Sequence, residues 1–360
     1  MRSPLGALEP QPWPDRVHTI AATGVTVGMA VRSDSQAMTG YVGSRRLAWH
    51  GPHAWHQEER IWSTTNRQLD VWIELLHTLD LDPAPVLLPT LTVDFEGDHW
   101  THAQVCKSDL WACYGIVVEE MPLLRPLLAH LVEQLERGHV ALMDADEYHL
   151  PDTDGGSHGR EHLRTVIAVT GYDRRRHVLR YIHGATGGEV GGRDLDALLA
   201  PSASSGHLLP CVQLVKLDRL APRSEAERAQ VGIALAHFHG TRFPTRNPVR
   251  AFADSLRVHG GLFAGGDAEH CQRWAFATLH QCGAAFEVGA DVCAWLAQHG
   301  EPVGNAVPHL RLVARNARSL HQRLVRLPLQ SKVPDVAQPL SDMARSWDDA
   351  MAVLRPRYAG

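Results

Sequence analysis

The chain has 360 residues, which is enough to bury a full core in one large domain or two modest ones. Its hydrophobic fraction of 44% and charged fraction of 21% are typical of a soluble globular protein, and no apolar run approaches the roughly 18 residues that span a bilayer. The six cysteines include no C-x-x-C pair and no disulfide-framework spacing, so we expect free thiols in a cytoplasmic protein.

The net charge of −5 is unevenly distributed along the chain. The first 200 residues carry a balance of −10 and the remainder a balance of +5. This asymmetry indicates either chance variation in an arginine-rich composition or an acidic catalytic half joined to a half that meets a polyanion. The histidine pairs His237/His239 and His99/His102 lack the further ligands of a recognisable zinc pattern, so we expect no metal site and no cofactor.

The N-terminal stretch, residues 1–16, is proline-rich and has no apolar segment, which predicts a disordered arm rather than a signal peptide. Two short strands are expected after it, at residues 25–31 and 40–42. Thr65 followed by Gln68 forms a capping-box pattern, which predicts the start of a helix. Apolar residues at three- and four-residue steps give this helix a buried face: Leu69, Trp72, Leu76 and Leu79.

The first turn of that helix carries unpaired backbone N–H groups and the positive end of the helix dipole. Such a position suits an activated nucleophile or a bound anion, and the residue there is Arg67. Downstream, Asp94, Glu96 and Asp98 would share one face of an extended chain, because side chains repeat every two residues. These three carboxylates indicate either a solvated edge or a pocket for an amino group.

The middle of the chain alternates helical and extended patterns. The predicted elements are helices at 108–115 and 123–138, a buried strand at 140–146, a hairpin with strands at 163–170 and 177–183, a glycine-rich loop at 184–192, and a last strand at 208–217. We therefore predict an α+β catalytic domain over residues 17–222.

From residue 223 onward the pattern is helical, which predicts a helical domain over 223–360. Residues 270–299 are apolar on nearly every side, as in a buried central helix. Residues 308–327 have an apolar stripe on one side and four arginines on the other: Arg311, Arg315, Arg318 and Arg326. This basic face indicates contact with a polyanion, although a solvated face is the simpler interpretation when it is seen alone.

The order of a helix N-terminus, a histidine opening a later strand and a polar residue on the next strand is that of the papain-like fold. Beyond this order, the chain resembles the bacterial family catalogued as domain of unknown function 1839. The matching stretches are Asn66 with Asp70–His77, Asp94–Thr101, Leu150–Thr153, His162 with Thr165, Asn247–Phe252, Gln281–Glu287 and Trp347–Asp348.

The resemblance implies a papain-like α+β domain with an antiparallel sheet and packed helices, followed by a mostly α-helical part. It also implies kinship with aminoacyltransferases that use carrier proteins or aminoacyl-tRNA as donors in antibiotic biosynthesis. Two positions depart from the family pattern. Arg67 stands where the family has cysteine, and Gly184 follows His183 where the family has asparagine.

Without the cysteine, no covalent thioester can form at this position. We therefore expect direct transfer of an aminoacyl group from aminoacyl-tRNA to a small amine, hydroxylamine or hydrazine, with no membrane involved. The expected catalytic residues are His162 as base, Arg67 as anion binder, and Asp152. The expected substrate-binding residues are Asn66, Asp94, Glu96, Asp98, Asp146 and His183. A carrier-protein thioester as donor and a non-catalytic, partner-binding paralogue are the alternatives.

Overall fold

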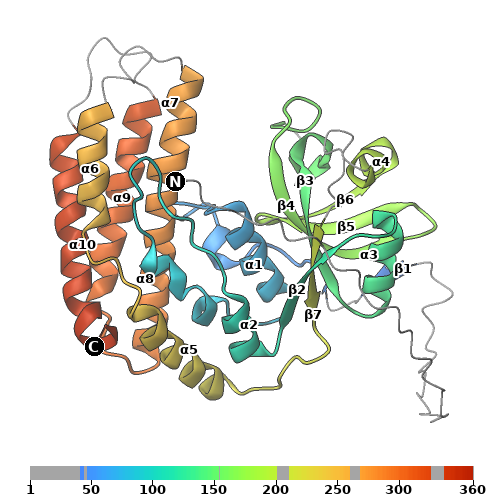
Figure 1. Cartoon of the computed structure of the whole chain (residues 1–360), viewed down its shortest axis with the longest axis horizontal. Coiled ribbons are helices and arrows are strands. Elements are labelled where there is room, and N and C mark those ends of the chain that lie inside the picture. Colours follow the sequence, from blue (N-terminus) through green and yellow to red (C-terminus); the bar gives the residue numbers. More distant parts are fainter. Residues whose placement is uncertain are drawn as a thin grey trace, which may run out of the picture.

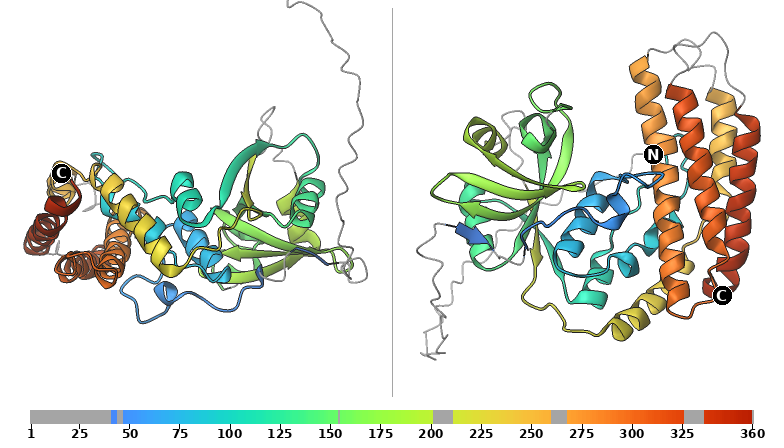
Figure 2. Two further views of the ribbon diagram at one scale, coloured as in Figure 1. Left: turned by 90° about the horizontal axis from the view of Figure 1, so that it is seen from below. Right: turned by 180° about the vertical axis from the view of Figure 1, so that it is seen from behind.

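The computed structural model describes residues 41–43, 47–153, 155–200, 211–259, 268–325 and 336–359. A seven-stranded antiparallel sheet forms one side of the molecule and a bundle of long helices forms the other (Figure 1). Helices α1 (Arg67–Thr78) and α2 (Lys107–Tyr114) lie between these two bodies, as the two further views also show (Figure 2). The predicted α+β class with a mostly helical C-terminal part is confirmed.

The sheet has the strand order β2-β7-β3-β4-β5-β6, and β1 pairs with β4. Its strands are β1 (Tyr41–Gly43), β2 (Val117–Pro122), β3 (Val140–Asp146), β4 (Arg164–Asp173), β5 (Val178–His183), β6 (Thr186–Gly191) and β7 (Cys211–Lys216). Helices α3 (Leu127–Glu136) and α4 (Gly192–Leu199) pack on the sheet (Figure 1).

The alternation of side chains along the strands separates two cores. Leu142 and Ala168 belong to the large core that contains α1 and the helical bundle. Their strand neighbours Met143 and Ile167 belong to a smaller core, which also contains the apolar residues of α3 and α4. The sheet is therefore covered on one face by α1 and on the other by α3 and α4.

The bundle consists of α6 (Pro248–His259), α7 (Ala268–Ala275), α8 (Gln281–Gln298), α9 (Ala306–Val325) and α10 (Ala337–Tyr358), and α5 (Glu225–Gly240) connects it to the sheet. Helix α8 is buried along most of its length, as its apolar composition predicts. A single π-helical turn, Phe276–His280, joins α7 to α8. In the described part of the chain, no helix is both long and apolar enough to cross a membrane.

Helix α1 begins at Arg67, but the predicted capping box is wrong. The N-cap is Asn66, whose side-chain oxygen accepts a hydrogen bond from the Leu69 N–H at 3.0 Å. Thr65 instead donates to the Asp70 carboxylate through both its backbone N–H and its hydroxyl. Thr65 is held at the Asp70 carboxylate, and the next residue, Asn66, supplies the cap in its place.

A buried ionic network anchors this start of α1. His56 Nδ1 lies 2.5 Å from the Glu74 carboxylate and His56 Nε2 lies 3.1 Å from that of Asp70. The Glu74 carboxylate also accepts from the His53 N–H and the Trp49 indole. Burial alone would lower the pKa of His56, but its hydrogen bonds to the Asp70 and Glu74 carboxylates outweigh burial and raise that pKa to about 9.

Two further predictions are wrong. The glycine-rich segment 184–192 is not a loop, because residues Thr186–Gly191 form the edge strand β6. The segment carrying Asp94, Glu96 and Asp98 is not extended, because Gly97 adopts a φ of +90° and a turn brings Phe95 opposite Trp100. The predicted strand 140–146 and the hairpin of β4 and β5 are confirmed, and β7 confirms residues 211–216 of the predicted strand 208–217, whose first residues lie outside the described part of the chain. The predicted arm 1–16 and strand 25–31 lie outside the described residues.

Candidate functional site

A cavity of about 430 Å³ opens between the start of α1 and the sheet. Gln68 lines it from α1, and strands β2, β7, β3 and β4 form the rest of its wall. The charged residues among its lining are Glu120, Asp144 and Arg164, and the Arg164 guanidinium donates to the Asp144 carboxylate at 2.7 Å. The cavity is large enough for a small substrate and is lined by both signs of charge.

His162 lies two residues before the cavity-lining Arg164, which is the first residue of β4. Its Nδ1 lies 2.6 Å from the Asp146 carboxylate at the end of β3, and its ring stacks on Tyr148 at a centroid distance of 4.3 Å. The His162 side chain is 69% exposed. Because Asp146 engages Nδ1, the remaining ring nitrogen, Nε2, is the one available to exchange protons with a ligand.

The environment of Asp146 keeps it ionised. Burial tends to raise the pKa of Asp146, but hydrogen bonds from His162 and from the Tyr148 N–H outweigh it and lower the pKa below its usual value. An ionised carboxylate on Nδ1 orients the imidazole and stabilises its protonated form. The sequence placed Asp146 among the substrate-binding residues, whereas in the structure it is the partner of His162.

Arg67, the first residue of α1, also faces the end of β3. Its guanidinium forms an ion pair with Glu147 at 3.2 Å, and its side chain remains 45% exposed. Glu147 is fixed by a hydrogen bond from the Ser157 hydroxyl and donates its own backbone N–H to the Leu163 carbonyl. Consecutive residues of one short segment, Asp146 and Glu147, therefore hold His162 and Arg67.

His183 and Asp152 form a second, more buried pair. Asp152 accepts hydrogen bonds from His183 Nδ1 at 2.7 Å, from the Tyr181 hydroxyl at 2.5 Å and from the Thr186 hydroxyl at 2.9 Å. Burial opposes ionisation of Asp152, but these donors lower its pKa. His183 Nε2 lies 2.9 Å from the Thr165 hydroxyl, so both ring nitrogens are engaged. Asp152 thus partners His183 and not His162.

The remaining predicted substrate-binding residues do not line the cavity. The Asn66 amide caps α1 and donates to the Ala103 carbonyl at 3.0 Å. The Asp94 carboxylate accepts from the Phe95 N–H, Asp98 pairs with His99, and Glu96 is exposed. Their loop contacts α6 of the bundle through a hydrogen bond from Ser255 to the Gly97 carbonyl. These carboxylates therefore lie together on a loop of the helical body.

The predicted two-faced helix is present as α9. Arg311, Arg315 and Arg318 are exposed, whereas its apolar stripe is buried. Asp291 of α8 pairs with Arg311 at 3.2 Å, so this basic face has an acidic neighbour. Arg318 lies over the Trp62 ring at 4.9 Å. Arg326 lies outside the described residues.

Sequence reasoning missed several residues of this site, namely Asp144, Glu147, Tyr148 and Arg164. The usable signal was the strand pattern of residues 140–146, since polar residues at the end of a buried strand meet those at the start of its antiparallel neighbour. The register confirms this, because Asp146 lies opposite Arg164.

Comparison with known families matches both parts of the chain. The model described as the DUF1839 N-terminal domain matches residues 51–217, and that of the DUF1839 C-terminal domain matches residues 225–356. No curated protein gives a significant match.

Proposed function

The chain belongs to the DUF1839 family, and from this premise we propose that it is an aminoacyltransferase. In this proposal it moves an aminoacyl group from aminoacyl-tRNA to a small nitrogen nucleophile, such as an amine, hydroxylamine or hydrazine, without a covalent cysteine intermediate. The observation that carries the proposal is the His162–Asp146 pair, which presents a free imidazole nitrogen beside a charged cavity while the start of α1 bears Arg67.

The chemistry requires one base and no thiol. The acceptor nitrogen attacks the ester carbonyl of the donor, and His162 Nε2 takes the proton that the nitrogen loses. The carbon–oxygen bond to the tRNA ribose then breaks, and the leaving oxygen takes a proton from the imidazolium. Asp146 stabilises the imidazolium between these two steps. A hydroxylamine or hydrazine is nucleophilic enough to react in this way when it is held in place.

Arg67 supplies positive charge where the family has a nucleophile. Its guanidinium adds to the positive end of the α1 dipole, and its exposed ion pair with Glu147 is weak enough for a substrate anion to displace. The developing oxyanion or a terminal phosphate of the donor would serve as that anion. The papain-like relationship of the fold is part of this proposal, and the placement of a helix start opposite a sheet histidine supports it.

The donor's α-ammonium group requires a carboxylate, and the cavity offers two. Asp144 and Glu120 both line it, and Asp144 already binds the Arg164 guanidinium. We therefore assign the ammonium to this wall rather than to the loop of Asp94, Glu96 and Asp98. The free amino group of an aminoacyl ester is the feature that distinguishes it from other acyl donors, so this contact would select the donor class.

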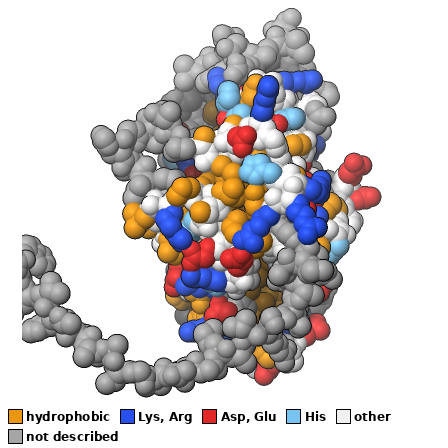
Figure 3. All heavy atoms as spheres, turned by 90° about the vertical axis from the view of Figure 1, so that its right-hand side faces the viewer, with side chains coloured by type: hydrophobic (Ala, Val, Ile, Leu, Met, Phe, Trp, Pro, Cys, Tyr) orange, Lys and Arg blue, Asp and Glu red, His pale blue; other side chains and the backbone are white. Residues whose placement is uncertain are grey.

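The basic face of α9 supports tRNA as the carrier of the aminoacyl group. Arg311, Arg315 and Arg318 are exposed on this helix, and of these three only Arg311 has an acidic partner within the described part of the chain. The sheet end of the molecule differs, because basic and acidic side chains lie beside one another over it (Figure 3). An acidic carrier protein would meet the same helix face, and this donor is the alternative that the experiment must separate.

The proposal is tested by transfer from a panel of charged tRNAs to hydroxylamine, which converts an aminoacyl ester into a hydroxamate. We expect hydroxamate to form faster than in the protein-free reaction for at least one amino acid. His162→Ala should lower this rate by about 10²–10⁴-fold, the usual range for loss of a general base. The matched control is His99→Ala, because His99 is also an exposed histidine paired with an aspartate but lies on the distant loop.

Two outcomes would overturn the proposal. No acceleration with any charged tRNA, together with transfer from an aminoacyl carrier-protein thioester, would establish the alternative donor. No acceleration with either donor would leave a non-catalytic, partner-binding protein. An equal loss in His162→Ala and His99→Ala would remove His162 from the mechanism.

A further inference from the structure

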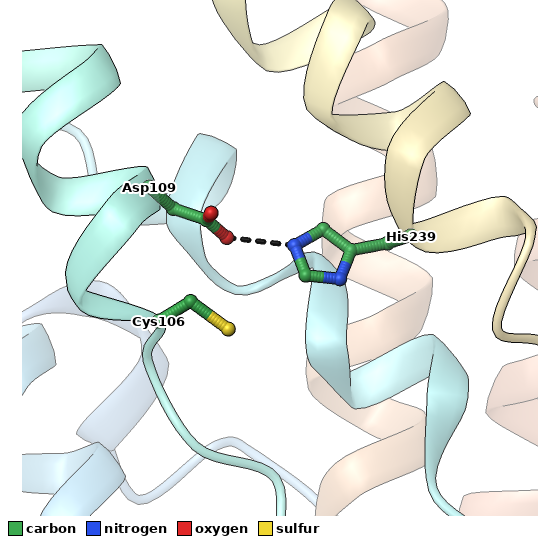
Figure 4. Close-up of side chains that lie close together, drawn as sticks. All are labelled: Cys106, Asp109 and His239. Carbon is green, nitrogen blue, oxygen red and sulfur yellow. Dashed lines mark hydrogen bonds and ion pairs between the residues drawn. The ribbon is translucent and has the colours of Figure 1, made fainter.

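Three side chains that can bind metal ions meet where α2 approaches α5, away from the cavity described above (Figure 4). They are Cys106 at the N-cap of α2, Asp109 in its first turn and His239 in the last turn of α5. One sulfur, one oxygen and one nitrogen from these residues all lie within 4.8 Å of one another. The Cys106 sulfur and the Asp109 carboxylate point toward the same edge of the imidazole (Figure 4).

The cluster is buried and incompletely paired. The His239 and Asp109 side chains are each 1% exposed, and His239 Nε2 lies 2.7 Å from the Asp109 carboxylate. His239 Nδ1 is buried and has no hydrogen-bond partner among the described residues. This nitrogen lies on the side of the ring away from Asp109 and Cys106, so it can carry the imidazole proton when Nε2 binds a cation (Figure 4). Cys106 is only half-buried, so the cluster can be reached from solvent.

The charges do not favour a catalytic cysteine here. Burial and the Asp109 carboxylate raise the pKa of Cys106, and the guanidinium of Arg242 only partly offsets them. In a catalytic triad, the histidine binds the thiol through one nitrogen and the carboxylate through the other. Asp109 and Cys106 instead share one edge of the His239 ring (Figure 4). A thiol, a carboxylate and an imidazole that converge on one point are the ligands of a cation.

We propose that Cys106, Asp109 and His239 bind a divalent transition metal, and that this metal is Zn²⁺. Zinc takes a thiolate, a carboxylate and an imidazole in tetrahedral geometry, and three protein ligands leave its fourth position for water. The thiolate ligand excludes Mg²⁺ and Ca²⁺, which require oxygen donors. Arg242 is exposed and therefore free to leave the sulfur when the metal binds.

The metal would join two parts of the chain. Cys106 and Asp109 lie in the region matched by the N-terminal family domain, and His239 lies in the region matched by the C-terminal one. A ligand set divided in this way stabilises the interface between the domains, because the metal binds the folded state only. The proposal is independent of the aminoacyl-transfer proposal, since the two sites share no residue.

Binding releases one proton. The Cys106 S–H bond breaks, its proton goes to solvent, and a bond forms from the sulfur to the metal. The imidazole proton shared between His239 Nε2 and Asp109 moves to Nδ1 by exchange with solvent, and Nδ1 has no competing partner. The affinity of the site for the metal should therefore rise with pH, and it should level off where the thiol is already ionised in the metal-free protein.

The test uses the full chain stripped of metal and titrated with Co²⁺ as a spectroscopic substitute for Zn²⁺. We expect one equivalent to bind, with the absorption bands of tetrahedral cobalt and a thiolate-to-cobalt charge-transfer band. Zn²⁺ should then displace it. Cys106→Ser should abolish the charge-transfer band, and His239→Gln should weaken binding at least about 100-fold, since even loss of an outer-shell partner costs 10–100-fold.

The matched control is His237→Gln, which changes an exposed histidine two residues away on the same helix and should bind cobalt like the wild type. If His239→Gln does not fold, as judged by circular dichroism, Cys106→Ser alone decides, because its site is half-exposed. Absence of cobalt binding at micromolar concentration would overturn the proposal. Binding that lacks a thiolate band, or that survives both substitutions unchanged, would overturn it equally.

Discussion

The stability of the chain should fall as the pH rises from 6.5 to 9, because His56 loses its proton in this window. In the folded state the pKa of His56 is raised to about 9 by the buried carboxylates of Asp70 and Glu74, against 6.5 in the unfolded chain. A folded-state pKa above the unfolded value stabilises the fold at a pH below 6.5, and this contribution disappears as the pH rises through 9. The shift corresponds to about 3 kcal/mol.

The measurement is urea unfolding followed by tryptophan fluorescence at a series of pH values, for the wild type and for His56→Gln. Glutamine is close in size and donates a hydrogen bond but does not titrate. The difference in unfolding free energy between the two proteins isolates His56 from other groups that titrate in this range. We expect this difference to shrink by about 3 kcal/mol between pH 6.5 and 9.5.

A local readout distinguishes this network from a general effect of charge. Asp70 accepts from the Thr65 N–H, and Asn66 caps the Leu69 N–H, so the protection factors of both amides, which correct for the intrinsic pH dependence of exchange, should fall above pH 9. The protection factors of the amides of α10, which lies on the far side of the helical bundle, should not change (Figure 1). A difference between wild type and His56→Gln that stays constant from pH 6.5 to 9.5 would refute the assignment of a protonated His56.

Three further predictions concern the donor, the mechanism and a second buried histidine. The double substitution Arg315→Glu with Arg318→Glu should reduce the slope of log affinity for tRNA against log salt concentration by about 2. Filter binding with charged and uncharged tRNA measures this slope, and an unchanged slope would mean that α9 does not bind tRNA. Mass spectrometry after incubation with charged donor should find no aminoacyl adduct on the wild type, whereas Arg67→Cys should acquire one at residue 67; an adduct on the wild type would defeat direct transfer. Burial lowers the pKa of His280 to about 4, so the contribution of neutral His280 to stability is present above pH 6.5 and should be lost as the pH falls toward 4. In urea unfolding, His280→Gln should reduce the loss of stability between pH 6.5 and 4 by about 3 kcal/mol.

Hydrophobic periodicity predicted those elements whose burial follows a single face. The apolar stripe of α9 is buried at Leu310, Val313 and Leu320, as three- and four-residue spacing requires. The hairpin of β4 and β5 was predicted from its alternating apolar residues, although β4 runs to Asp173, beyond the predicted end. In both cases the pattern that specifies the element lies within the element itself.

The edge strand β6 was missed because its glycines indicate a loop to any local rule. Neighbouring aromatic rings leave no room for larger side chains at these glycines. A Cβ on Gly188 would lie 2.4 Å from the Tyr181 ring, and one on Gly187 would lie 2.7 Å from Trp49. The strand is glycine-rich because bulky side chains from β5 and from the loop before α1 occupy the space above it. Such a reason is visible only when the register is known.

The candidate site was predicted only in part, because the contacts that form it also depend on strand register. His162 was identified by its place before a strand, but its partner Asp146 was predicted to bind substrate, and Asp152 was predicted to be catalytic without a stated role. Asp146 and His162 meet because β3 and β4 pair in one register, a fact that spacing alone does not contain. The pairing of Asp109 with His239 joins residues 130 positions apart and could not be read from any motif.

The two histidine–aspartate pairs of the sheet differ in a way that bears on function. The His183 side chain is only 12% exposed, both of its nitrogens are engaged, and its aspartate accepts from three side chains, as expected of a pair that holds β5 and β6 in place. His162 is mostly exposed and has one engaged nitrogen, so its pair with Asp146 adds little to stability. In the proposed function, an acceptor that is itself a strong nucleophile needs a base such as His162 but no thiol, which is consistent with Arg67 at the start of α1.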